Sequence, residues 1–170
     1  MLEMQSVTRI LRENGFKVTP QRLAVYEALS KAYNHPNAEM LYSMLQPDYP
    51  TMSLATVYKA MDIFSELGLV QVLNVGEDSY RYDAETVSHP HIRCVSCNRV
   101  DDVFDIGDEF LLDTVSAKSG YELTGRQLYF FGRCPECRKK LGRMAIMKKT
   151  TKRVLTRALR CCTIKIEECI

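Results

Sequence analysis

The sequence has no apolar run approaching the roughly 20 residues that a membrane-spanning helix needs, which argues against an integral membrane protein. Residues 1–15 are charged and helical in period, and they contain no apolar core of the kind found in signal peptides. There is also no internal repeat and no low-complexity segment. We therefore expect a cytoplasmic protein, in which cysteines stay reduced.

Positive charge is scarce over most of the chain. Residues 141–170 contain eight Lys or Arg and two Glu, whereas residues 1–140 contain 15 basic and 19 acidic side chains. Any DNA binding by the main part of the chain must therefore use a local basic patch. The basic tail could touch DNA electrostatically, but its composition favours a solvated or disordered extension, and Cys161, Cys162 and Cys169 within it show no pairing pattern.

The first 67 residues have the apolar spacing and the capping residues of helices. Thr19 and Pro20 are a typical N-cap and first helical residue. Asn37 and Ser53 can cap two later helices in the same way. The predicted helices cover about residues 5–14, 20–31, 38–45 and 54–67.

The last of these helices is amphipathic. Val57 and Phe64 lie on its apolar face, and Thr56, Lys59 and Ile63 lie opposite. Two short strand-like runs follow at 69–73 and 79–83, separated by a turn signal that includes Gly76. Helices followed by a hairpin predict a winged helix, a variant of the helix-turn-helix.

A strand-rich second domain is predicted after a polar linker that ends at Pro90. Runs of β-branched and aromatic residues support its strands. The whole chain is therefore expected to belong to the α+β class. The expected elements are strands at about 92–95, 99–105 and 127–133, and a helix near 107–119.

Two Cys-x-x-Cys pairs are the strongest chemical signal in the chain. Cys94 and Cys97 form the first pair, and Cys134 and Cys137 form the second. Two intervening residues let both thiolates of a pair reach one tetrahedral ion, and a reduced compartment favours metal over disulfide. Four thiolates leave no open coordination position, so we predict a structural zinc site. The alternative is four unrelated reduced cysteines.

The three histidines are placed near this cysteine motif or must be brought to it by the fold. His89 and His91 are separated by one residue and lie just before Cys94. Neutral imidazoles with carboxylates suit a divalent ion such as Fe(II), Mn(II) or Zn(II). A polar linker is the alternative for this pair, and His35 taken alone is more typical of a loop histidine before a proline.

From about residue 5 to residue 140 the chain resembles the ferric uptake regulator (Fur) family. The resemblance rests on Gly15–Arg22 (GFKVTPQR), on Ser53–Lys59 (SLATVYK), on the run from His89 to Cys97 and on the second cysteine pair. Family members are homodimeric repressors with an N-terminal winged helix and a C-terminal α/β dimerisation domain. The resemblance implies a winged-helix domain at 1–83, a hinge at 84–90, and a dimerisation and metal-binding domain at 91–140. Residues 141–170 lie outside the resemblance and are expected to form a basic extension of unknown role.

The resemblance also implies two metal sites. By motif position, regulatory Fe(II) or Mn(II) would be held by His35, Asp83, His89, His91 and Asp102, whereas the four cysteines would hold structural zinc. All five regulatory positions carry residues that can bind a metal. The neighbouring Asp101 would point to the opposite face of its strand.

Two details favour the peroxide-sensing (PerR) branch of the family. Asp102 is an aspartate as in that branch, whereas iron sensors usually have glutamate there. An extra site of many iron sensors cannot form, because its positions hold Ser88, Pro90 and Arg126. In the peroxide-sensing branch, bound Fe(II) reacts with peroxide and ligand histidines are oxidised, here His35 or His89 by position. An iron-responsive repressor is the alternative within the family.

DNA contacts follow from the resemblance as well. Helix 54–67 would enter the major groove of an A·T-rich palindromic operator in double-stranded DNA. Thr56 and Lys59 lie on its exposed side, and Tyr58 would contact a thymine methyl group. Lys17 would approach the minor groove, and Arg22 would approach a phosphate.

Two other classes of protein fit the sequence less well. A zinc enzyme such as a nucleobase deaminase needs His-x-Glu and Pro-Cys-x-x-Cys with an open coordination position. This chain has no His-x-Glu, and its proline lies inside the second cysteine pair. A zinc-stabilised nucleic-acid-binding module without sensing would hold no exchangeable second metal. We therefore predict a regulator that is not an enzyme.

Overall fold

The computed structural model describes residues 2–76, 80–106 and 110–141. The chain divides into two compact units. The first contains Met1–Arg93 and Arg99–Phe131, and the second contains Cys94–Asn98 and Gly132–Ile170. The predicted domain boundaries at residues 83 and 90 stay predictions. Most of the basic tail, including its cysteines, lies outside the described residues.

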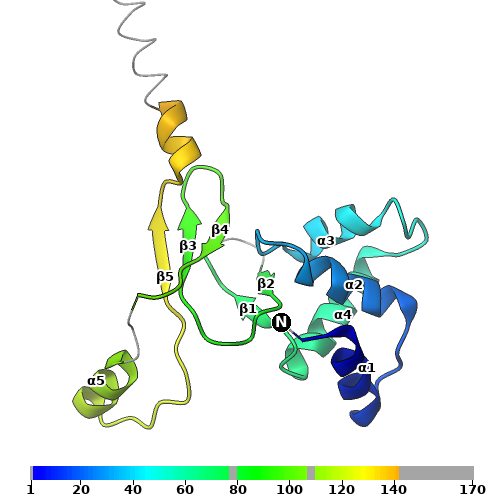
Figure 1. The fold of residues 1–170 in the computed structure, drawn as a ribbon, viewed down its shortest axis with the longest axis horizontal. Coiled ribbons are helices and arrows are strands. Elements are labelled where there is room, and N and C mark those ends of the chain that lie inside the picture. The colour runs from blue at the N-terminus through cyan, green and yellow to red at the C-terminus, as the bar shows by residue number, and fades with distance from the viewer. Residues whose placement is uncertain (1, 77–79, 107–109, 142–170) are drawn as a thin grey trace, which may run out of the picture. The chain divides into compact units, whose positions relative to one another are not determined.

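Four helices form the N-terminal part of the first unit (Figure 1). Their N-caps are those expected from the sequence. Thr19, Asn37 and Ser53 each accept a hydrogen bond from the backbone N–H three residues later, which satisfies a donor that the helix leaves unpaired. The helices are α1 (Met4–Glu13), α2 (Pro20–Ser30), α3 (Ala38–Leu45) and α4 (Leu54–Glu66), each within one residue of its predicted bounds.

The core of this helical part forms where α2, α3 and α4 pack against one another. Tyr26 and Phe64 meet edge to face, with ring centroids 5.4 Å apart. Val57 and Phe64 are fully buried, as the amphipathic pattern of α4 predicts. The prediction that Ile63 lies opposite this face was wrong. Ile63 is only 7% exposed, because the neighbouring elements cover a wider arc of α4 than its most apolar stripe.

The predicted hairpin is present as a two-stranded antiparallel sheet. It consists of β1 (Gln71–Leu73) and β2 (Arg81–Asp83), with Val72 opposite Tyr82. All three residues of β2 are buried. Helices followed by this hairpin give the winged-helix order that the sequence predicts.

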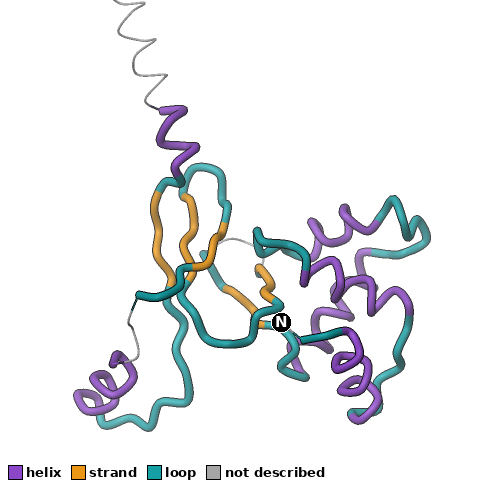
Figure 2. The backbone as a smooth tube through the Cα atoms, in the orientation of Figure 1, coloured by secondary structure: helices purple, strands orange, loops and turns teal. Residues whose placement is uncertain are grey.

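The strands of a second sheet lie side by side (Figure 2), in the order β4-β3-β5 (Figure 1). Its strands are β3 (His91–Cys94), β4 (Val100–Asp102) and β5 (Tyr129–Gly132), and helix α5 (Phe110–Ser119) lies between β4 and β5 in the chain. These elements confirm the predicted ones, although β3 begins one residue earlier than predicted and β4 and β5 are shorter. The register of the antiparallel β3–β4 pair sets His91 opposite Asp102.

A small apolar cluster joins the hairpin to the second sheet within the first unit. Leu73 and Val75 pack with Val100, and Tyr129 lies against them. No helix within the described residues is long and apolar enough to span a bilayer. The mixed helix and sheet content agrees with the predicted α+β class.

Candidate metal centres

The four cysteines of the two Cys-x-x-Cys pairs converge within the second unit. Their sulfur atoms all lie within 4.8 Å of one another, and Cys97 Sγ is 3.9 Å from Cys134 Sγ. A tetrahedral zinc ion with bonds of about 2.3 Å places its sulfur ligands about 3.8 Å apart. All four thiols are free rather than paired in disulfides. The donor set and its spacing therefore fit a closed tetrahedral zinc site.

Backbone amides already favour thiolate at one corner of this cluster. The N–H of Cys134 lies 3.3 Å from Cys94 Sγ. This hydrogen bond, together with one from the backbone of Ser96, lowers the pKa of Cys94 to about 6. The neighbouring sulfurs of Cys134 and Cys97 instead raise the pKa of Cys137 to about 12. A dication would supply the positive charge that full ionisation of the four thiols requires.

A second cluster brings together His35 and four residues that lie between positions 83 and 102. Within it, each residue has one ligand atom that lies within 4.8 Å of the others. The members are His35 in the loop after α2, Asp83 at the end of β2, His89 before β3, His91 at the start of β3 and Asp102 at the end of β4. All five belong to the first unit. The sequence-predicted regulatory residues are thus adjacent in space.

The Nε2 atoms of the three histidines point at the same two carboxylate oxygens. His35 Nε2 is 2.8 Å from Asp102 Oδ1, and His89 Nε2 is 3.0 Å from the same oxygen. The corresponding distances to Asp83 Oδ2 are 3.6 Å from His35, 3.3 Å from His89 and 3.4 Å from His91. Metal bonds of about 2.1 Å give ligand-to-ligand edges of about 3.0–3.5 Å. The five side chains are therefore spaced as the ligands of one cation would be.

Backbone carbonyl groups orient two of the rings. His89 Nδ1 is 2.8 Å from the carbonyl oxygen of Val87, and His35 Nδ1 is 3.4 Å from that of Val100. A ring that donates its Nδ1–H to a carbonyl keeps its Nε2 lone pair for a metal. The rings also pack on one another, with centroids 5.1 Å apart for His35 and His91 and 4.4 Å apart for His89 and His91.

The cluster is mostly closed to solvent. His35, Asp83 and His91 are buried, and the side chain of Asp102 is 29% exposed. Burial by itself would raise the pKa of Asp83, but hydrogen bonds from His35 and His91 hold that pKa well below its usual range. Burial opposes the charged form of His35, yet the hydrogen bond to Asp83 and the charge of Asp102 raise its pKa above 6.5. Imidazole nitrogens with two carboxylates suit Fe(II) or Mn(II).

Two residues beside this cluster were not anticipated from the sequence. Arg81 is 8% exposed and donates to the carbonyl oxygen of His35 at 3.4 Å. Phe104 stacks on the ring of His89, with centroids 5.1 Å apart. The strand period places Arg81 on the same face of β2 as Asp83, which is the only sequence signal that pointed to it. Asp101 lies outside the cluster and pairs with Arg99 at 2.9 Å.

The residues expected at DNA lie at the surface of the helical part. Arg22, Thr56 and Lys59 line one shallow pocket of about 210 Å³ between α2 and α4. The guanidinium of Arg22 donates to the carbonyl oxygen of Lys17, whose side chain is exposed. Three of the expected residues thus share a concave surface. A fourth, Lys17, is connected to this surface by its hydrogen bond with Arg22.

Tyr58 has a different neighbour. It is 38% exposed, and its hydroxyl group donates to the carboxylate of Glu39 on α3. This hydrogen bond raises the pKa of Tyr58 to about 12. Tyr58 is therefore held at the surface by α3, beside rather than inside the pocket that Arg22 lines.

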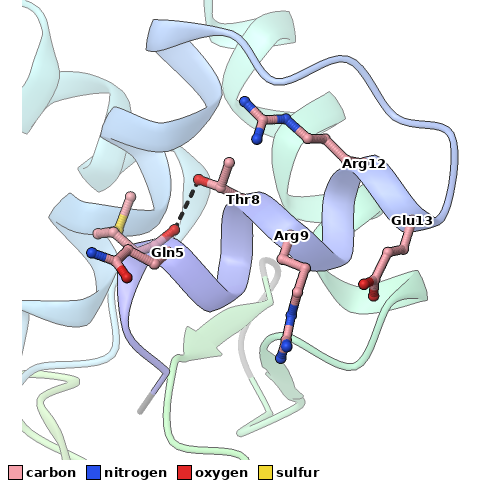
Figure 3. A pocket seen from close by; sticks show the side chains of 6 residues that line it. Gln5, Thr8, Arg9, Arg12 and Glu13 are labelled. Atoms are coloured by element: carbon pink, nitrogen blue, oxygen red, sulfur yellow. Dashed lines mark hydrogen bonds between the residues drawn. The ribbon is translucent and has the colours of Figure 1, made fainter.

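A larger hollow of about 410 Å³ lies on the outer side of α1 (Figure 3). Thr8 in it donates to the carbonyl oxygen of Met4 at 2.8 Å, so its hydroxyl is engaged within the helix. Arg9 and Arg12 extend from α1 in different directions (Figure 3). None of the residues lining this hollow belongs to either metal cluster, and its side chains do not converge on a common point.

Comparisons with known proteins lead to one family of regulators. The model of the ferric uptake regulator family matches residues 13–131. The chain is 48% identical over 137 residues to the transcriptional regulator PerR of Clostridium acetobutylicum, covering 81% of this chain and 99% of that protein. It is 35% identical over 138 residues to the peroxide operon regulator of Bacillus subtilis, covering 81% and 95%. The crystal structure of the Campylobacter jejuni peroxide stress regulator matches with a TM-score of 0.62 and 30% identity, covering 81% of this chain and 100% of that one.

Proposed function

The chain belongs to the ferric uptake regulator family, and we propose that it is a metal-dependent transcriptional repressor that senses peroxide. The observation that carries this proposal is the cluster of His35, Asp83, His89, His91 and Asp102, whose ligand atoms lie within 4.8 Å of one another. The relatives named as PerR and as peroxide operon regulator support the peroxide-sensing branch over the iron-responsive one.

Two metals have different roles in this proposal. The four cysteines hold zinc in a closed site, which stabilises the fold and leaves no position for a substrate. The three histidines and two aspartates hold Fe(II) or Mn(II), the regulatory ion. Because the cysteine site is closed and the family consists of transcriptional regulators, we do not assign the chain an enzymatic activity.

The regulatory site can control DNA binding because its ligands come from different structural elements. His35 and Asp83 lie in the helical part and its hairpin, whereas His91 and Asp102 lie in the second sheet. A cation that binds all four favours the conformation in which these segments are close. The operator would then be bound by the metal-loaded conformation and released when the ligand set is broken.

For DNA, we assign α4 to the major groove of an A·T-rich palindromic operator. Thr56, Tyr58 and Lys59 project from this helix at exposed or half-buried positions. Arg22 lies beside them and would contact a phosphate, and the exposed Lys17 would approach the minor groove. A repressor acts where the chromosome is, so we place the protein in the cytoplasm.

A palindromic operator requires a two-fold symmetric protein, and a homodimer supplies it. The first unit exposes several large apolar side chains in its C-terminal part, which is typical of a surface covered by a partner. We assign this surface to the second copy of the chain. It includes Phe104, Ile106, Phe110, Val115, Tyr121 and Phe130, each at least 42% exposed.

Peroxide sensing is assigned to His35 and His89. Bound Fe(II) would supply the electrons that cleave the peroxide bond. The chain contributes two imidazole rings whose Nε2 atoms lie 2.8 and 3.0 Å from Asp102 Oδ1, so both rings would be ligands of the same ion. An added oxygen atom would destroy a ligand, release the metal and free the operator.

Mass spectrometry of peroxide-treated protein tests this function. The Fe(II)-loaded protein should gain the mass of one oxygen atom on the peptide containing His35 or the one containing His89, and it should lose operator binding. The Mn(II)-loaded protein should bind the operator and stay unmodified. Unmodified peptides with retained operator binding in the Fe(II) form would contradict peroxide sensing and would favour the iron-responsive alternative.

A further inference from the structure

His35 has an unusual backbone conformation for a metal-ligand candidate. Its φ of 47° lies in the left-handed region, which residues other than glycine rarely adopt. The following residue, Pro36, further restricts the loop because its own φ is fixed. A non-glycine residue keeps such a conformation only where its surroundings hold it in place. The loop that carries His35 should therefore have an anchor.

Strand β2 provides that anchor. The side chain of Arg81 donates from Nη1 to the carbonyl oxygen of His35 at 3.4 Å, and the N–H of Tyr82 donates to the carbonyl oxygen of Pro36 at 3.2 Å. Arg81 also lies 3.2 Å from the sulfur of Met40 in α3. With 8% of its surface exposed, this guanidinium is buried between the loop and α3.

We infer that Arg81 is a positioning residue for the regulatory cation, acting through His35. By holding the carbonyl oxygen of His35, it keeps the imidazole where its Nε2 lies 2.8 Å from Asp102 Oδ1. Strand β2 then serves the site twice, because it supplies Asp83 as a ligand and fixes His35 as another. The inference rests on the proposed function only in that the cluster binds a divalent cation.

Whether removal of Arg81 weakens or strengthens metal binding distinguishes a positioning role from an electrostatic one. A positive charge near a cation site opposes cation binding. If the charge of Arg81 were its main influence, its removal would strengthen metal binding. If Arg81 acts by orienting His35, its removal should weaken metal binding, typically by about 10–100-fold for a residue that orients a metal ligand.

The test compares variants of the full chain with zinc retained. Arg81→Met removes the donors and keeps an apolar stem, and Arg81→Lys keeps the charge and one donor group. We expect Arg81→Met to weaken Mn(II) binding, measured by electron paramagnetic resonance, by about 10–100-fold, and Arg81→Lys to recover part of it. Co(II) bound to Arg81→Met should show an altered visible absorption spectrum, because the His35 ligand is displaced.

Arg93 offers a matched control. It lies two residues after His91, as Arg81 lies two residues before Asp83, and it also donates to backbone carbonyl groups. Its acceptors are Val75 at 2.7 Å and Gly76 at 2.8 Å, in the hairpin rather than in the loop of His35. Arg93→Met should therefore keep the Mn(II) affinity and the Co(II) spectrum of the natural protein.

Zinc content, and thermal unfolding measured with zinc but without regulatory metal, report on folding in each variant. Arg81→Gln, which keeps an N–H donor on a shorter neutral side chain, replaces Arg81→Met if that variant loses zinc. The inference would be overturned if a folded Arg81 variant kept the Mn(II) affinity and the Co(II) spectrum of the natural protein. It would also be overturned if Arg93→Met changed both to the same extent. Failure of the natural protein itself to bind Mn(II) would instead overturn the proposed function.

Discussion

His35 Nε2 lies 2.8 Å from Asp102 Oδ1, although one residue belongs to the loop after α2 and the other ends strand β4. Without a metal, so short a contact requires a proton on the imidazole, which makes it a charge-assisted hydrogen bond. With a metal, the same two atoms become neighbouring ligands and the proton must leave. Protons and divalent cations therefore compete for one position, and that competition connects the fold of this site to its chemistry.

Adjacent aspartates allow a direct test of the assigned ligand set. Asp102→Ala removes a carboxylate that faces all three histidines, so Mn(II) affinity should fall at least about 10-fold. Asp101→Ala removes a carboxylate that pairs with Arg99 at 2.9 Å and lies outside the cluster. Its Mn(II) affinity should equal that of the natural protein, as measured by equilibrium dialysis. Equal losses in both variants would show that Asp102 acts through folding rather than as a ligand.

The metal-free and metal-loaded proteins should respond to pH in opposite directions. The pKa of His35 is raised above 6.5, so its contribution to stability is complete below that pH and is lost as the pH rises through the folded-state value. The pKa of Asp83 is lowered from 3.8, so its contribution is present above that pH and is lost only in stronger acid. Without regulatory metal, Tm should fall as the pH rises above 6.5.

Added Mn(II) should reverse this slope, because the cation needs neutral imidazoles and binds more tightly as they lose protons. Calorimetry of the zinc-loaded protein, with and without Mn(II), measures both slopes. His35→Asn is the control, because it removes the raised pKa and should flatten the metal-free profile. A metal-free profile that is unaffected by His35→Asn would refute the assignment.

Local signals in the sequence were sufficient for the elements and for the cysteine site. Thr19, Asn37 and Ser53 mark helix starts because a cap needs only a side chain and an amide three residues away. The cysteine site could also be predicted from the sequence, because the spacing within each pair lets both thiolates reach one metal ion. Contacts through space were not readable from the residues alone. His35 looked like an ordinary loop histidine, and only the resemblance to a family placed it beside Asp102.

Side chains that act through a neighbour were missed for the same physical reason. Arg81 looks like a polar residue of an edge strand, and nothing in its local pattern shows that its guanidinium reaches the carbonyl oxygen of His35. Glu39 gives no sign in the sequence that it accepts from Tyr58 on another helix. Ile63 was misplaced because periodicity gives the direction of an apolar face but not the width that neighbouring helices cover.

Loss of one cysteine of the closed site should destabilise the protein. The free energy of binding a structural zinc is folding free energy, about 10–16 kcal/mol in small zinc domains. We expect Cys137→Ser to lose zinc and at least about 3 kcal/mol of stability, which lowers Tm by roughly 6–12 °C in a protein of this size. Zinc analysis and calorimetry measure both quantities. Cys169→Ser, which removes a cysteine that belongs to neither Cys-x-x-Cys pair, should change neither, and a stable Cys137→Ser protein without zinc would contradict the structural role.

Two lysines of the helical part, Lys59 and Lys31, allow a direct contact with DNA to be distinguished from an effect of overall charge. Lys59 lines the pocket shared with Arg22 and Thr56, whereas Lys31 pairs with Glu27 at 2.6 Å on α2 and does not line it. Each phosphate contact contributes about 0.9 to the slope of log affinity against log salt concentration. If Lys59 contacts one phosphate of each half-site, Lys59→Ala should lower that slope by about 1.8 for a dimer.

Lys31→Ala carries the same change in net charge and should leave the slope unaltered. Fluorescence anisotropy with operator DNA at several salt concentrations, with saturating Mn(II), measures both variants against the natural protein. The Mn(II) affinity of each variant must also equal that of the natural protein, because a weaker metal site would reduce DNA binding without any change in the contacts with DNA. If the slope falls equally in both variants, the basic surface acts by overall charge, and the assignment of Lys59 to the operator interface fails.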